Sequence, residues 1–139
     1  MRSMDAAAAA RIPILAALTP RDREQVLRSA RERRFAPGDV VVAEGHPALH
    51  VYFVVDGHAD VEQSAAGLIG RLGPGDFFGE LGIIEEHART ATVIAADELT
   101  VLMLPAWEFR ALLDEHPHMA VPMLRELIAR LHRKEHRGI

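Results

Sequence analysis

Apolar and polar positions divide the chain into three zones. The first zone is helical: Thr19 and Pro20 form an N-cap and a first-turn proline, and the predicted helix ends within the arginine-rich run 28–34. From about residue 35 to residue 104, short apolar runs alternate with glycine- and proline-containing turns, which predicts β-strands. From residue 107 onward the spacing is helical again, and Pro117 divides this part into two helices.

Turn chemistry predicts how the strands pair. Asp56-Gly57 is a strong hairpin signal, so segments 51–55 and 58–62 are expected to pair across it. Segments 90–95 and 99–104 are expected to form a second pair. Strands this short at this spacing are typical of a sandwich or jelly roll. We therefore predict a mainly β fold with flanking helices, namely a jelly-roll (double-stranded β-helix) barrel with an N-terminal helical segment and two C-terminal helices.

Length and composition limit the number of domains and the class of protein. A chain of 139 residues with 49% hydrophobic and 26% charged residues is typical of one globular domain, expected at residues 11–139 after a disordered lead at residues 1–10. The net charge of −4 argues against direct DNA binding through phosphate contacts. The absence of cysteine excludes disulfides, iron–sulfur clusters and thiolate zinc sites. Arg11 and Pro13 interrupt the apolar N-terminal stretch, so we expect no membrane span and a cytoplasmic location.

Candidate chemistry is concentrated between residues 73 and 93. Gly79 permits unusual torsions and close approach, and Glu80 beside it is an acceptor suited to a sugar hydroxyl. The run 81–84 can form a short helix whose free N–H groups point at an anion. Arg89 offers a fork for phosphate oxygens. These residues describe a site for a phosphorylated ribose, although a glycine-rich turn in a β-protein is more often structural.

The same segment resembles the phosphate-binding cassette of the cyclic-nucleotide-binding family. The matching strings are Gly79-Glu80-Leu81-Gly82 and Arg89-Thr90-Ala91-Thr92-Val93, and the cassette is especially similar to that of bacterial catabolite activators. The resemblance implies that Arg89 pairs with the cyclic phosphate, that Glu80 accepts the ribose 2′-hydroxyl and that Thr90 adds a phosphate or base contact. The implied binding residues are Gly79, Glu80, Leu81, Gly82, Ile83, Arg89, Thr90 and Ala91. The implied ligand is cAMP, with cGMP possible, and no metal.

Two positions depart from the family pattern. Ala88 stands where the family usually has proline before the arginine. Lys134 and Glu135 stand where the activator's last helix contacts the purine, so the base contact differs or is missing. Met119, Met123 and the apolar stripe of the last helix, which includes Leu124 and Ile128, form either a homodimer seam or a cover for the barrel.

The favoured hypothesis is a non-catalytic cyclic-nucleotide sensor that relays ligand binding to its C-terminal helices. The alternative is a ligand-free jelly-roll module for dimerisation or docking. A metal-dependent cupin-like enzyme ranks lowest, because His46, His50 and His58 do not follow the spacing of a cupin metal site. The sequence contains neither a catalytic triad of nucleophile, base and orienting residue nor a Walker-type phosphate loop. We therefore expect no catalysis.

Overall fold

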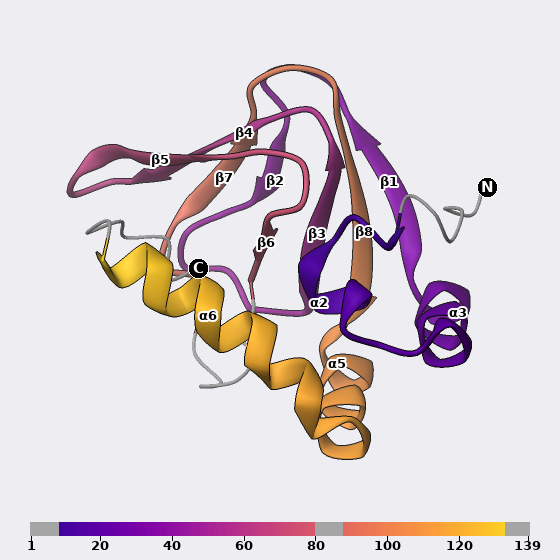
Figure 1. Ribbon diagram of the computed structural model, residues 1–139. Coiled ribbons are helices and arrows are strands. Elements are labelled where there is room, and N and C mark those ends of the chain that lie inside the picture. Colours follow the sequence, from indigo (N-terminus) through magenta and orange to yellow (C-terminus); the bar gives the residue numbers. More distant parts are fainter. Residues whose placement is uncertain (1–8, 80–87, 133–139) are drawn as a thin grey trace.

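Two antiparallel four-stranded sheets face each other in the computed structural model, which describes residues 9–79 and 88–132 (Figure 1). One sheet has the strand order β1-β8-β3-β6 and the other β2-β7-β4-β5. The strands are β1 (Arg31–Phe35), β2 (Val40–Val42), β3 (His50–Asp56), β4 (Ala59–Gln63), β5 (Gly67–Leu72), β6 (Phe77–Phe78), β7 (Thr92–Ala95) and β8 (Leu99–Pro105).

The space between the sheets holds one of the two apolar cores. Because side chains alternate along a strand, Tyr52 and Val54 of β3 point into this space and Val51 and Phe53 point to the opposite face. Both sheets contribute to this core, which contains Phe35, Val42, Tyr52, Val54, Ala59, Val61, Leu72, Phe78, Ala91, Val93, Ala95, Leu99 and Val101.

The helices cover the outer face of the sheet that contains β3 and β8. They are α2 (Pro13–Ala16), α3 (Pro20–Ser29), α5 (Ala106–Glu115), the 3-10 turn η1 (Pro117–Met119) and α6 (Ala120–His132). Their apolar residues, such as Leu15, Val26 and Phe109, pack with Phe53 and Leu102 of that sheet in a second core. The predicted mainly β fold with flanking helices is confirmed. No helix in the described residues is long and apolar enough to span a bilayer.

Both predicted local strand pairs are wrong. β3 pairs with β8 and β6, while β4 pairs with β5 and β7, so Asp56-Gly57 carries the chain from one sheet to the other. In the same way, the turn after β7 leads to β8 in the opposite sheet. The signal at Asp56-Gly57 correctly indicated a turn with positive φ, since Gly57 has φ +85°. It could not indicate the partners of β3 and β4, because strand pairing depends on contacts with distant parts of the chain.

The arginine-rich run belongs largely to a strand and not to the end of a helix. Helix α3 ends at Ser29, and Arg31 to Phe35 pair residue by residue with β8, from Arg31 opposite Met103 to Phe35 opposite Leu99. This is an edge strand, in which only Phe35 is buried. Charged residues are common on edge strands because they oppose further strand pairing, and they remove the apolar alternation that identifies a strand in sequence.

Candidate functional site

Arg89 is the one charged residue in the described part of the chain that is buried, with 4% of its surface exposed. Its backbone N–H donates to the carbonyl oxygen of His46 at 2.9 Å, and its own carbonyl accepts from Gly45 N–H at 2.8 Å. These two bonds fix the backbone of Arg89 against the loop after β2. They explain how the backbone of Arg89 keeps its position although alanine, and not proline, precedes it at residue 88.

The guanidinium group of Arg89 is oriented by backbone carbonyl groups. Nη1 donates to the carbonyl oxygen of Gly79 at 2.9 Å, and Nη2 donates to that of His50 at 2.6 Å. A buried guanidinium is costly unless its N–H groups are bonded. The carbonyl oxygens of Gly79 and His50 supply such bonds for Nη1 and Nη2.

Gly79 is required by its contact with Arg89. Its φ of +94° lies in the left-handed region that favours glycine. A Cβ atom at this position would lie 2.5 Å from Nη1 of Arg89 and 2.9 Å from the carbonyl oxygen of His50. In the structure the group that approaches Gly79 is therefore the arginine itself, and the predicted close approach to a ligand stays a prediction.

An aromatic and weakly basic surface adjoins the guanidinium group. Tyr52 stacks on Phe78 with ring centroids 4.8 Å apart, and the guanidinium carbon of Arg89 lies 5.8 Å from the centre of the Tyr52 ring. Burial raises the pKa of Tyr52. Burial, followed by the positive charges of Arg89 and Arg33, lowers the pKa of His50. Partial burial is thus the first cause of the shift at both side chains.

A pocket of about 280 Å³ opens beside these groups. His46, His50, Tyr52 and Arg89 contribute its polar groups, and strand β2 contributes an apolar wall. Sequence reasoning missed His50 and Tyr52. No motif identifies them, because one contributes a backbone carbonyl and the other lies within an ordinary apolar strand.

The remaining predicted residues divide into two groups. Thr90 is exposed, and its carbonyl oxygen accepts from Nε2 of Gln63 at 3.1 Å, while Ala91 is buried in the core between the sheets. Glu80, Leu81, Gly82 and Ile83 lie outside the described residues, as do Lys134 and Glu135. The structure therefore brings Gly79 and Arg89 together, and Thr90 and Ala91 directly follow Arg89 in the chain.

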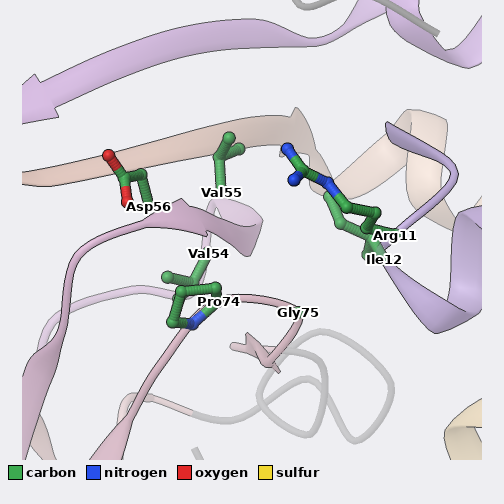
Figure 2. A pocket seen from close by; sticks show the side chains of 7 residues that line it. All are labelled: Arg11, Ile12, Val54, Val55, Asp56, Pro74 and Gly75. Atoms are coloured by element: carbon green, nitrogen blue, oxygen red, sulfur yellow. The ribbon is translucent and has the colours of Figure 1, made fainter. Parts of the chain in front are cut away.

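A second pocket, of about 600 Å³, contains none of the predicted site residues. Figure 2 shows Arg11 and Asp56 at opposite ends of it, with Val55 between them. Both charged side chains are exposed, and Pro74 and Gly75 complete the wall. Two solvated charges of opposite sign are a poorer anion site than a buried, oriented guanidinium, so we place the candidate site at Arg89.

The described histidines do not gather into a metal site. In the described ranges, no group of three or more His, Cys, Asp or Glu residues could hold a metal ion. His58 has a structural role, because its Nδ1 lies 2.8 Å from Oδ2 of Asp97 and its backbone N–H donates to Oδ1 of the same residue at 2.7 Å. This contact joins the turn between β3 and β4 to the turn between β7 and β8.

Comparison with known proteins agrees with the geometry. The model of one protein family, described as the cyclic nucleotide-binding domain, matches residues 32–116. A putative potassium channel protein of Rhodopseudomonas palustris is 34% identical over 80% of this chain and 27% of its own length. A cAMP-dependent protein kinase regulatory subunit of Hypocrea atroviridis is 35% identical over 73% of this chain and 22% of its own length. The chain thus spans about a quarter of these relatives.

Solved structures show the same fold. The regulatory domain of Toxoplasma gondii PKA, crystallised with cAMP, aligns with a TM-score of 0.77 and 25% identity over 88% of this chain and 48% of that one. The catabolite activator protein of Thermus thermophilus aligns with a TM-score of 0.75 and 25% identity over 88% of this chain and 59% of that one.

Proposed function

The chain belongs to the family of cyclic nucleotide-binding domains, and from this premise we propose that it is a non-catalytic cAMP sensor whose Arg89 binds the cyclic phosphate. The observation that carries the proposal is the buried guanidinium of Arg89, oriented by the carbonyl groups of Gly79 and His50. Such a group binds phosphate oxygens through charge-assisted hydrogen bonds without first having to be ordered. The cAMP-bound regulatory domain among the similar structures supports the choice of nucleotide.

Glu80 and the backbone of Leu81, Gly82 and Ile83 are proposed to bind the ribose and the phosphate, as the resemblance implies. The net charge of −4 supports a function without direct DNA binding. The absence of cysteine is consistent with a reducing compartment, and we place the protein in the cytoplasm.

A short path of hydrogen bonds supports a relay from Arg89 to the C-terminal helices. His50 accepts from Arg89 through its carbonyl oxygen, and the preceding residue, Leu49, accepts from the backbone N–H of Ala106 at 2.9 Å. Ala106 is the first residue of α5. A phosphate that changes the bond between Arg89 and His50 displaces a peptide group adjacent to the one that holds α5, and α5 leads through η1 to α6.

Met119 and Met123 are buried against the sheet and so cover it, whereas a separate exposed stripe of α6 supports a homodimer. Val121, Leu124, Ile128 and Leu131 follow the 3-4-3 spacing of a coiled-coil seam, and between 45% and 75% of each residue is exposed. We propose that two copies pair through this stripe. The same observation favours the alternative function, a ligand-free dimerisation module, which the following experiment distinguishes from a sensor.

Calorimetric titration with cAMP and cGMP tests the proposal. Wild-type protein is expected to bind cAMP, and Arg89→Ala to bind it about 100-fold more weakly or not at all, because a buried charge pair with phosphate is lost. Arg71→Ala is the matched control: Arg71 is an exposed arginine paired with Asp60 at 2.9 Å, and its removal should leave the affinity unchanged. Absence of binding by the wild type, together with a stable dimer, would favour the ligand-free module.

A further inference from the structure

A groove lies between helices α3 and α5, and none of its lining residues lines the pocket beside Arg89. The end of α5 lies beside the first turn of α3, because Nδ1 of His116 is 3.5 Å from Oδ2 of Asp22. The groove has a volume of about 280 Å³, and the residues that characterise it are Val26, Ser29, Trp107, Glu108, Ala111 and Glu115.

Trp107 lies at the edge of this groove and is 67% exposed. It is the single tryptophan of the chain. An exposed tryptophan beside a groove differs from a scattered surface leucine, because its large rigid surface and its N–H group make it a frequent anchor of protein interfaces. Val26 of α3, which is almost fully buried, also lines the groove.

The charge of the groove indicates what kind of partner it binds. Glu108 and Glu115 line it, and the described residues that line it include no lysine, arginine or histidine. The two glutamates lie seven positions apart on α5, a rise of about 10.5 Å along the helix. Ala111 lies between them in the chain and Ser29 of α3 also lines the groove, so two of the lining side chains are small.

We propose that this groove is the docking site for an amphipathic helix of a partner protein that carries two basic residues seven positions apart. The basic residues pair with Glu108 and Glu115, and aliphatic residues between them pack on Val26 and Trp107. A helix laid into a groove between two helices is a common mode of recognition, and the matching seven-residue spacing sets its register. The proposal does not depend on nucleotide binding, although Trp107 directly follows Ala106, which is bonded to Leu49.

Fluorescence of Trp107 tests the proposal in the full chain, because no other tryptophan contributes. The probe is an alanine-rich helical peptide with two arginines seven residues apart and leucines between them. Its control is the same peptide with both arginines replaced by citrulline, which keeps the shape and removes the charge. The arginine peptide is expected to shift the Trp107 emission saturably, and the citrulline peptide to bind about tenfold more weakly.

The charge pairing is tested from the protein side with the double variant Glu108→Gln/Glu115→Gln. It should bind the arginine peptide about tenfold more weakly than the wild type, whereas Glu62→Gln, an exposed glutamate on β4, should bind it normally. The peptide comparison uses unaltered protein, so its result stands even if the double variant unfolds. Equal affinity for the two peptides, or no change in Trp107 emission with either, would overturn the proposal.

Discussion

Nη2 of Arg89 donates a hydrogen bond of 2.6 Å to the carbonyl oxygen of His50, a residue 39 positions earlier in the chain. Nη1 bonds to Gly79 in the same way, so one side chain links strand β3 to the end of β6. Arg89 is therefore part of the fold as well as the proposed phosphate ligand.

Replacement of Arg89 is expected to destabilise the protein in the absence of any nucleotide. Arg89→Ala should lower the free energy of unfolding by about 2–4 kcal/mol, because two charge-assisted hydrogen bonds are lost, one buried and one part-buried. Arg89→Lys should have an intermediate effect, since an ammonium group cannot reproduce the planar fork that reaches both oxygens. Urea denaturation without ligand measures these differences. Unfolding curves identical to that of the wild type would contradict the structural role.

Gly79→Ala is expected to lower the free energy of unfolding by more than the strain of a positive φ alone would. The added Cβ would lie 2.5 Å from Nη1 of Arg89, so the guanidinium must move as well. Gly38→Ala is the matched control: its φ of +90° is similar, and no atom lies within 4 Å of the added Cβ. We expect about 1–2 kcal/mol for Gly38→Ala and a clearly larger loss for Gly79→Ala, with reduced cAMP affinity only in the latter. Thermal unfolding and calorimetry measure both effects, and equal losses would refute the contact.

Because of the contact between His58 and Asp97, the free energy of unfolding is expected to fall as the pH becomes acidic. Hydrogen bonds from the side chain and the backbone of His58 lower the pKa of Asp97 below its ordinary value of 3.8. A carboxyl group whose folded pKa is lowered adds stability above its unfolded pKa, and this stability is lost as the pH falls through the folded pKa. Asp97→Asn should therefore be less stable than wild type at neutral pH, and the difference should shrink below pH 3.8.

Denaturation curves across this pH range provide the measurement. Glu98→Gln, at the exposed neighbouring position, is the control and should show no such convergence. A difference between Asp97→Asn and wild type that stays constant with pH would show that the ionised carboxylate does not contribute.

The apolar stripe of α6 is expected to hold two copies together. Wild-type protein should sediment as a dimer, and Leu124→Gln/Ile128→Gln should sediment as a monomer, because both residues lie on the exposed seam. Arg125→Gln, an exposed position of α6 that is not part of the stripe, should remain dimeric. A monomeric wild type at micromolar concentration would exclude this seam as a stable interface.

Local chemistry in the sequence was sufficient to find the turns and the helix start at Thr19, and the family resemblance singled out Gly79 and Arg89. Thr19 does accept a hydrogen bond from Asp22 N–H at 3.2 Å, as expected of an N-cap. Each of these features depends on residue types within a few positions of each other, or on a motif of fixed spacing.

Neither the strand pairing nor the bond between Arg89 and the carbonyl oxygen of His50 could be predicted in this way. Whether β3 pairs with β4 or with β8 depends on the apolar surface that the whole fold buries, and the turn between β3 and β4 is compatible with either. The oxygen that His50 contributes belongs to the backbone, which any residue could provide. The edge strand β1 was missed because its arginines carry no apolar alternation.

The pairing of β1 with β8 also has a consequence for how the domain forms. The first and last strands of the described chain are neighbours, with Arg31 opposite Met103 and Phe35 opposite Leu99. During synthesis, β1 must wait for its partner until nearly the whole sheet region has been made. Such high contact order is typical of folding in roughly milliseconds to seconds, and of a domain that does not tolerate division into separately folding halves.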